Sequence, residues 1–317
     1  MKKWFVITVD TEGDNLWEPY QTEAGCREIT TENAKYLPRF QSLCERYGYI
    51  PTYLTNYEMA MDHCFVEMAR EGLRHKKLEI GMHLHAWNTP PIYELPFNPK
   101  GHNAYAGEYP VDILREKMYN LITLLQERFQ CDIRSHRGGR WYLDTNICRF
   151  LIELGVTTDC TVTSGCNWNN AIGNHIGGID YSGFPDDIYR MDIDTLREGE
   201  AGLFEIPPTI MNAAPLKMRI PQDIKDLKSM VDKKRVWMRP NGHNLYNLLY
   251  IAEECNKRNR YIEFMIHSSE LMPGGSPTFK NERSIEKLYK HLDILFKTLK
   301  GYGYEGCMLS EMAKNYE

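Results

Sequence analysis

The sequence lacks the long apolar segments that mark exported or membrane-spanning chains. Its first apolar run, over residues 4–9, stops at Asp10 and is too short for the core of a signal peptide. No later stretch reaches the roughly 18 consecutive apolar residues that a membrane-spanning helix needs. We therefore expect a soluble, cytoplasmic protein with no membrane span.

Paired cysteines are also missing. The chain has 9 cysteines, an odd number, and none of them forms a C-x-x-C pair. This pattern excludes a zinc ribbon and favours reduced thiols in a cytoplasmic protein.

Neither sign of charge is in large excess. Lys and Arg number 38 against 43 Asp and Glu, which leaves a net charge of −5 and predicts no broad surface for nucleic acid. Hydrophobic residues make up 42% and charged residues 26%, close to globular averages, so the chain can build a sizeable core. Because no internal repeat or linker of biased composition divides it, we predict a single domain over residues 1–317.

Strand and helix patterns alternate along the chain. The strand patterns cover residues 4–9, 52–55, 78–85, 132–136, 155–158, 203–206 and 261–266. The helix patterns cover residues 30–47, 58–74, 111–129, 144–154, 221–232, 245–257 and 284–299. Such alternation predicts a parallel sheet covered by helices, either closed into a barrel or doubly wound. In both folds the chemistry lies at the carboxyl ends of the strands.

Side chains that can bind a metal or transfer a proton lie at these predicted strand ends. They are Asp10, Glu12, His83, His85, Arg137, Asp159 and His267. Since side chains alternate along an extended chain, Asp10 and Glu12 share one face, as do His83 and His85. Two imidazoles and one carboxylate are the protein ligands of an open catalytic metal site. Zinc is the first choice, and the same ligands suit Fe²⁺, Co²⁺, Mn²⁺ or Ni²⁺.

A simpler interpretation stays open for each of these residues. A single histidine at a strand end is more often a hydrogen-bonded polar residue than a metal ligand. Acidic residues beside Gly13 are common as turn caps. The H-x-H pair favours the metal interpretation over the simpler one.

The order of these elements resembles the NodB-like polysaccharide deacetylases of carbohydrate esterase family four, and looks most like the branch named after WbmS. The resemblance covers nearly the whole chain and implies an irregular seven-stranded (β/α) barrel. The segment Thr-Val-Asp10-Thr-Glu12 is similar to the family's first motif, which implies that Asp10 is the catalytic base and Glu12 a metal ligand. Asp14 is a reserve ligand.

The second family motif has two metal-binding histidines four residues apart, and this chain departs from it. His83 matches the first histidine, but Trp87 stands at the position of the second. We infer His85 as the replacement ligand from strand alternation.

Three further motifs are similar to those of the family. Ser-His-Arg137-Gly-Gly implies that Arg137 pairs with and orients the catalytic carboxylate. Thr-Asp159-Cys implies an acid that holds the catalytic histidine, and Phe-Met-Ile-His267-Ser-Ser-Glu implies that His267 is the general acid. Asp159 would thus keep His267 protonated.

Several residues near these motifs are candidates for substrate contact. Trp87, Trp141 and Trp168 could stack on sugar faces, although isolated aromatic residues more often pack in the core or at its rim. Arg140 is as consistent with a rim ion pair as with a substrate contact. No role is assigned to His243, to Arg239 or to the two adjacent aspartates at positions 186 and 187.

Together these features predict a metal-dependent hydrolase that removes an acetyl or similar acyl group from an N-acetylated sugar. The metal would polarise the acyl carbonyl and a water molecule, Asp10 would take the water's proton, and His267 would protonate the leaving nitrogen. A cytoplasmic enzyme would act on a polysaccharide or glycan precursor linked to a nucleotide or lipid. The oligomeric state is not predicted.

Three alternatives stay open. The same motifs suit an amide hydrolase with a non-sugar substrate, or a glycan-binding protein with a degenerate site. The run ending in Asp10-Thr-Glu12-Gly13 also looks like the nucleophile loop of haloacid dehalogenase-type phosphatases, which would have a second Asp in place of Glu12.

Overall fold

The computed structural model describes residues 2–16, 29–213 and 235–316. The helix predicted over residues 221–232 lies outside the described residues.

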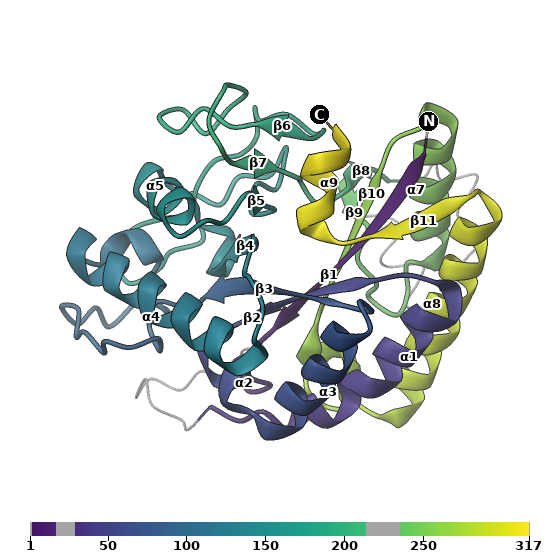
Figure 1. The fold of residues 1–317 in the computed structure, drawn as a ribbon, viewed down its shortest axis with the longest axis horizontal. Coiled ribbons are helices and arrows are strands. Elements are labelled where there is room, and N and C mark those ends of the chain that lie inside the picture. The colour runs from purple at the N-terminus through teal and green to yellow at the C-terminus, as the bar shows by residue number, and fades with distance from the viewer. Residues whose placement is uncertain (1, 17–28, 214–234, 317) are drawn as a thin grey trace.

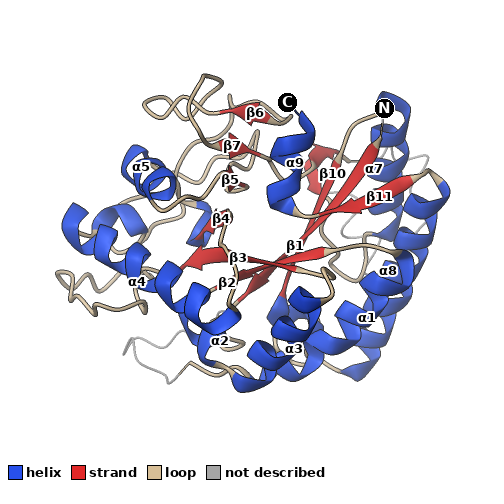
Figure 2. Ribbon diagram, in the orientation of Figure 1, coloured by secondary structure: helices blue, strands red, loops and turns tan. Residues whose placement is uncertain are grey.

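One curved sheet forms the centre of the molecule (Figures 1 and 2). Its strands run in the order β10, β1, β2, β3, β4, β5, β7, β6, and β11 pairs with the first half of β1. All pairs in this sheet are parallel except β6 with β7. A separate antiparallel pair joins β8 and β9. The strand bounds are β1 (Lys3–Thr11), β2 (Pro51–Thr55), β3 (Glu79–Leu84), β4 (Ser135–Gly138), β5 (Thr158–Asp159), β6 (Tyr189–Arg190), β7 (Phe204–Glu205), β8 (Ile210–Asn212), β9 (Arg235–Trp237), β10 (Ile262–His267) and β11 (Tyr304–Cys307).

The described part of the sheet does not close into the seven-stranded barrel that we predicted. It is a curled half-barrel whose two edges are β10 and β6. The strands β5, β6 and β7 have only two residues each, too few to build a continuous ladder around the ring. One backbone hydrogen bond joins the segment after β7 to β5, from Ile206 to Asp159, and another joins it to the edge strand β10, from Thr209 to Glu263.

The helices follow the strands as the sequence pattern predicts. Their bounds are α1 (Leu37–Tyr47), α2 (Tyr57–Met61), α3 (His63–Arg74), α4 (Val111–Phe129), α5 (Thr145–Glu153), α7 (Leu245–Arg258), α8 (Glu282–Gly301) and α9 (Leu309–Tyr316). The 3-10 helices are η1 (Glu32–Tyr36), η2 (Ala106–Glu108), η3 (Gly139–Trp141) and η5 (Ser268–Leu271).

Two helix predictions differ in detail from the structure. Residues 58–74 form two helices rather than one, because Asp62 leaves the helical conformation and its side chain caps α3 by accepting the N–H of Phe65. Residues 30–47 begin as η1 before α1. The end of α1 is as predicted, since Gly48 takes the left-handed conformation at φ 74°.

The side chains of β1 alternate between two apolar clusters. Phe5, Ile7 and Val9 pack outward in the large cluster that contains the covering helices. Val6 points into the curve of the sheet, where it meets the apolar face of α9 around Leu309. Figure 1 shows α9 inside this curve, and it contacts both β1 and β5. Apolar packing therefore fills the interior beside the first half of β1 and leaves the carboxyl ends of the strands for polar groups.

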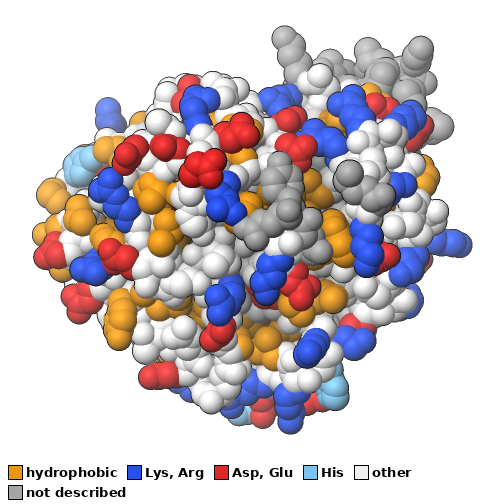
Figure 3. All heavy atoms as spheres, turned by 45° about the horizontal axis from the view of Figure 1, so that its top comes forward, with side chains coloured by type: hydrophobic (Ala, Val, Ile, Leu, Met, Phe, Trp, Pro, Cys, Tyr) orange, Lys and Arg blue, Asp and Glu red, His pale blue; other side chains and the backbone are white. Residues whose placement is uncertain are grey.

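The surface agrees with the balanced composition. On the face shown in Figure 3, basic and acidic side chains are interspersed. Among residues 2–16, 29–213 and 235–316, no helix has the length and apolar character to cross a membrane. The eight cysteines in these ranges are all free thiols.

Candidate active site

Predicted functional side chains gather at the carboxyl ends of the parallel strands. Strand register brings this about: Asp10 on β1 pairs with His267 on β10, and His83 on β3 pairs with Arg137 on β4. Residues in register on neighbouring parallel strands point to the same face of the sheet at the same height. The structure therefore brings these four residues together at one edge.

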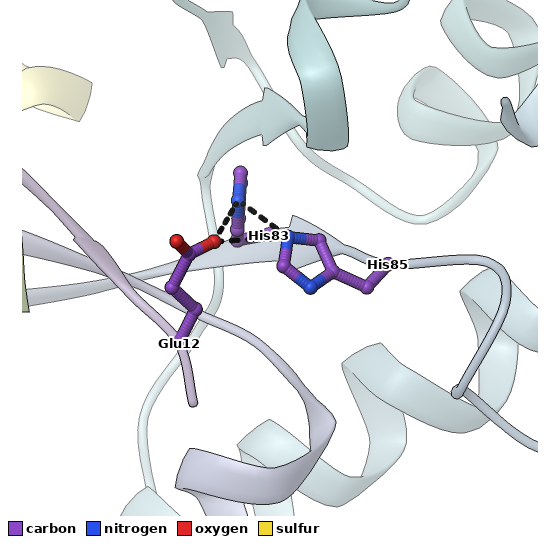
Figure 4. A group of neighbouring side chains, drawn as sticks. All are labelled: Glu12, His83 and His85. Atoms are coloured by element: carbon purple, nitrogen blue, oxygen red, sulfur yellow. Dashed lines mark hydrogen bonds and ion pairs between the residues drawn. The ribbon is translucent and has the colours of Figure 1, made fainter. Parts of the chain in front are cut away.

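Glu12, His83 and His85 form a compact group of potential metal ligands (Figure 4). Nε2 of His85 lies 3.1 Å from Oε2 of Glu12 and 3.1 Å from Nε2 of His83. Nε2 of His83 lies 3.5 Å from the same oxygen of Glu12. A tetrahedral zinc ion with bonds of about 2.0–2.2 Å would hold its ligand atoms roughly 3.3–3.6 Å apart. The three side chains thus have nearly the spacing that such an ion requires.

The hydrogen bonding of His83 also suits a metal. Its Nδ1 lies 2.9 Å from the backbone carbonyl of Arg137, so this nitrogen donates a proton to that oxygen. When the ring is neutral, its Nε2 lone pair faces the Glu12 carboxylate and the His85 ring. Metal-bound histidines usually donate their other ring N–H to such a carbonyl or carboxylate.

Electrostatics in this group favour charged side chains. Burial raises the pKa of Glu12, but His267, His83 and His85 outweigh burial and hold this pKa well below its ordinary value. Burial lowers the pKa of His83, yet Asp10 and Glu12 raise it above its ordinary value. The ionised Glu12 carboxylate therefore places a buried negative charge between two imidazole rings, and a bound cation would balance that charge.

Two neighbours determine where the ring of His85 lies, although His85 itself stands just beyond β3. A Cβ atom at Gly139 would lie 2.8 Å from Cδ2 of His85, so only glycine leaves this space. On the other side the ring of Trp87 stacks on His85, with centroids 4.3 Å apart. Trp87, which we predicted as a sugar contact, therefore supports a candidate metal ligand.

Asp14 does not complete the metal group. Its Oδ1 accepts a hydrogen bond from Thr30 at 2.5 Å, and its Oδ2 accepts the N–H of Asn33 at 3.1 Å. Both oxygens thus bind residues at the start of η1. The expectation of a reserve ligand at Asp14 is wrong.

Asp10 is held by a buried arginine. Nη1 of Arg137 lies 2.6 Å from Oδ1 of Asp10, and Nη2 lies 2.7 Å from Glu263 on β10. Burial raises the pKa of Asp10, but Arg137, His83 and His267 lower it below its ordinary value. Asp10 is therefore ionised at neutral pH, as the resemblance implied for a catalytic base.

His267 faces Asp10 with one nitrogen and Glu270 with the other. Its Nε2 lies 3.7 Å from Oδ2 of Asp10 and 3.9 Å from Oε1 of Glu12. The Nδ1 atom of His267 lies 3.2 Å from Oε2 of Glu270. Nη2 of Arg239 lies 3.0 Å from this Nδ1 and also 3.0 Å from Oε1 of Glu270. Glu270 is the carboxylate placed to orient this ring.

The predicted pairing of Asp159 with His267 is wrong. Asp159 is fully buried and its Oδ1 lies 2.6 Å from Nδ1 of His136. The cause is strand alternation: the next residue, Cys160, packs inside the curve, so Asp159 points to the opposite face. There it lies beside Glu205, its register partner on β7. Burial and the charge of Asp159 raise the pKa of Glu205 well above its ordinary value.

A cavity of about 160 Å³ opens above the metal group. Asp10, Glu12, His83, His85 and His267 line it together with Leu16, Trp87, Asn103, Gly138, Arg140 and Trp141. The predicted contacts Trp87, Arg140 and Trp141 all border this space. The guanidinium of Arg140, however, donates to the backbone carbonyls of Asn103 and Ile172, so it joins two loops rather than presenting a free charge.

Sequence reasoning missed three residues of the site. Glu270 stands three positions after His267, and a single helical turn after the strand would have indicated their contact. Arg239 and Glu263 carry no such local signal, because each reaches its partner from a distant part of the fold.

Comparisons with known proteins give a fold and no family. No protein-family model matches the sequence, and no curated protein matches it. A putative polysaccharide deacetylase from Mycobacterium smegmatis has a similar structure, with a TM-score of 0.55 and 13% identity over 98% of this chain and 89% of that one. A putative glycoside hydrolase/deacetylase from Parabacteroides distasonis has a TM-score of 0.64 and 10% identity, over 99% of this chain and 71% of that one.

The fold also extends to other carbohydrate-active enzymes. A family 57 branching enzyme from Thermococcus kodakaraensis matches with a TM-score of 0.53 and 10% identity, over 100% of this chain and 72% of that one. At these identities the likenesses establish the fold alone, and the chemistry rests on the site. The comparisons show that the chain has the mixed α/β fold of the polysaccharide deacetylases.

Proposed function

We propose that the protein is a metal-dependent hydrolase that removes an acetyl or similar acyl group from the nitrogen of a sugar. The observation that carries this proposal is the meeting of three potential metal ligands, an ionised carboxylate and a histidine around one cavity. Membership of the WbmS-type branch stays a prediction.

Glu12, His83 and His85 are the residues that would hold the metal. Bound there, a divalent ion such as Zn²⁺, Co²⁺, Fe²⁺, Mn²⁺ or Ni²⁺ would polarise the acyl carbonyl and make water more acidic. All three residues are buried, with at most 7% of each residue's surface exposed, so the surrounding protein keeps most bulk water away from them.

Asp10 and His267 divide the proton transfers. Asp10, kept ionised by Arg137, accepts a proton from the attacking water. His267 presents Nε2 to the cavity and donates a proton to the departing nitrogen, while Glu270 holds its Nδ1. The two groups lie close enough to act on one acyl group, with 3.7 Å between Oδ2 of Asp10 and Nε2 of His267.

A sugar substrate agrees with the walls of the cavity. Trp87 and Trp141 offer flat apolar rings at its border, and Asn103 offers an amide. Aromatic rings beside a few polar groups suit the mixed apolar and hydroxyl surface of a sugar.

The replacement Asp10→Asn tests the role of the base. The amide cannot accept the water's proton, so we expect turnover to fall at least about a hundredfold. Metal content should stay near that of the unchanged protein, because Asp10 is not among the three ligands. The measurement is acetate release from N-acetylated amino sugars and their oligomers, with elemental analysis of the same samples.

Other results would favour the alternatives. Near-normal turnover in the Asp10→Asn variant would exclude Asp10 as the base. Magnesium-dependent release of phosphate from a generic phosphate ester, without acetate release, would favour a phosphatase. Sugar binding without any turnover would indicate a degenerate site.

A further inference from the structure

A second cavity, of about 550 Å³, lies beside the candidate active site. Trp141 lines both cavities. Arg239 and Glu270 line the second cavity and contact His267, which lines the first. The two spaces therefore meet at Trp141 and His267, and a ligand longer than one sugar would extend from one to the other.

The second cavity contains Arg235, whose side chain has no hydrogen-bond partner among the described residues. Nε of Arg235 is buried and makes no hydrogen bond, and no ion pair of Arg235 occurs within the described residues. Its guanidinium lies against Gly165, where a Cβ atom would come within 1.4 Å of Nη1. Gly165 thus leaves the space that Arg235 occupies. A partly buried cation with an unsatisfied donor is costly unless an anion or acceptor meets it.

Positive charge exceeds negative charge around this cavity. Its described lining contains Arg235, Arg239 and one acid, Glu270, which already pairs with Arg239. The first turn of the 14-residue helix α7 also borders the space through Tyr246 and Asn247. The N-terminus of a helix carries a partial positive charge. This excess is local, since the whole chain has a net charge of −5.

Aromatic rings form another part of the wall. Trp237 packs edge to face with Trp141 at 5.1 Å and with Trp168 at 6.3 Å between centroids. The indole N–H of Trp168 donates to Thr163 at 2.8 Å, which fixes that ring. Held rings next to a cationic group suit a sugar that carries a negative charge.

We propose that this second cavity binds an anionic group, a carboxylate or a phosphate, carried by the substrate sugar or by its neighbour in the glycan. Arg235 would contact the anion and the tryptophan rings would contact the sugar, while the acyl group reaches Glu12, His83 and His85. This inference rests on the proposed function for the identity of the reaction, and selectivity for an anionic sugar can be measured without turnover.

The test is equilibrium binding to the full-length, metal-loaded Asp10→Asn protein, which removes turnover from the measurement. The probes are N-acetylglucosamine, its 1-phosphate, and N-acetylglucosamine linked to glucuronic acid, followed by calorimetry or tryptophan fluorescence. We expect at least one charged probe to bind tenfold or more tightly than the neutral sugar, with the advantage shrinking as salt is added. The charged probe that wins identifies the group as phosphate or carboxylate.

A second variant locates the effect. Adding Arg235→Gln should remove most of the advantage of the charged probe and leave the affinity for the neutral sugar unchanged. The matched control is Arg149→Gln, which removes an exposed arginine that pairs with Asp194 on the surface. This control should keep the full advantage.

The possible failures are distinct. Equal affinity for charged and neutral probes would overturn the anion site. This comparison uses the Asp10→Asn protein alone, so it stands even if the Arg235 variant does not fold. An advantage that survives Arg235→Gln in a folded protein would also overturn it. Selective binding with no acetate release by the unchanged protein would support the anion site and contradict the proposed hydrolysis. Acetate release at the same kcat/KM from charged and neutral sugars would support the proposed hydrolysis and contradict the anion site.

Discussion

At the scale of residues, the metal group depends on three side chains held at close range. Each ligand atom of Glu12, His83 and His85 lies within 3.5 Å of the other two. Three potential ligands on one rigid edge of a sheet would give a preformed metal site, and the loss of one would leave only two.

We expect the purified protein to hold about one transition metal ion per chain, and His83→Ala and His85→Ala each to lose most of it. Elemental analysis of gently purified samples makes the measurement. Asp14→Asn is the control, because Asp14 bonds to Thr30 and Asn33 instead of the metal group, and it should keep its metal.

Two results would contradict this ligand set. Full metal content in either histidine variant would mean that its ring is not a ligand. Absence of metal after reconstitution with zinc, cobalt and manganese would exclude the metal-dependent reaction altogether.

Glu270 links the site to the pH dependence of stability. Burial raises its pKa, but Arg239 and His267 overcome burial and lower this pKa to about 2 from an ordinary value of 4.5. Since the folded-state pKa lies below the unfolded one, the stabilisation is complete above about pH 4.5. It is lost progressively as the pH falls toward 2.

For Glu270→Gln we therefore expect a weaker loss of stability in acid. As the pH falls from 4.5 to about 2.5, the free energy of unfolding should fall more steeply for the unchanged protein than for Glu270→Gln. The difference between the two slopes should reach up to about 1.4 kcal/mol per pH unit. Urea unfolding at several pH values measures both slopes. Glu127→Gln, at an exposed position on α4, should keep the original slope, and equal slopes for all three proteins would refute the role of Glu270.

Much of the site was predictable residue by residue, because it follows from strand alternation. That rule places His83 with His85 and Asp10 with Glu12, and the structure brings these side chains together. The same alternation turns Asp159 away from the interior, beside His136, so our prediction that it pairs with His267 was wrong. Glu263 and Arg239 depend on which distant strands become neighbours, and a single sequence does not contain that information.

At the scale of elements, long periodic segments were predicted closely and short strands only in part. The helices α4, α7 and α8 match their predicted ranges within two residues, because each has an apolar face over several turns. The two-residue strand β7 lies within the predicted strand over 203–206, and β5 overlaps the one over 155–158. The two-residue strand β6 was not predicted, because it is too short for a periodic signal. Within the described residues these strands are too short to complete the predicted ring, which leaves the sheet as a half-barrel.

At the scale of the whole molecule, two apolar clusters on opposite faces of one sheet support the site. The outer cluster joins the sheet to its covering helices. The inner cluster joins α9 to the inside of the sheet, away from the carboxyl ends of the strands. Leu309 is fully buried in the inner cluster, and its backbone N–H donates to Thr52 at the start of β2. The C-terminal helix thus supports strands that carry the site at their other ends.

Leu309→Ala should therefore destabilise the entire fold. Removing a fully buried leucine side chain costs about 2–5 kcal/mol, and we expect the free energy of unfolding to fall within this range. Chemical denaturation followed by circular dichroism measures it. Lys314→Ala, at an exposed position of the same helix, is the matched control, and equal stability of the two variants would show that α9 does not support the sheet.

Arg137 has a consequence for how relatives of this protein diverge. Its guanidinium joins Asp10 on β1, Glu263 on β10 and the carbonyl of Cys160, so it bridges the interior of the half-barrel between β10 and the segment after β5. Removing one partner of such a buried ion pair costs several kcal/mol whether or not the protein is an enzyme. A descendant that lost the reaction would still be selected to keep this arginine. Among homologues, conservation of Glu12, His83 and His85 is therefore the better marker of retained activity.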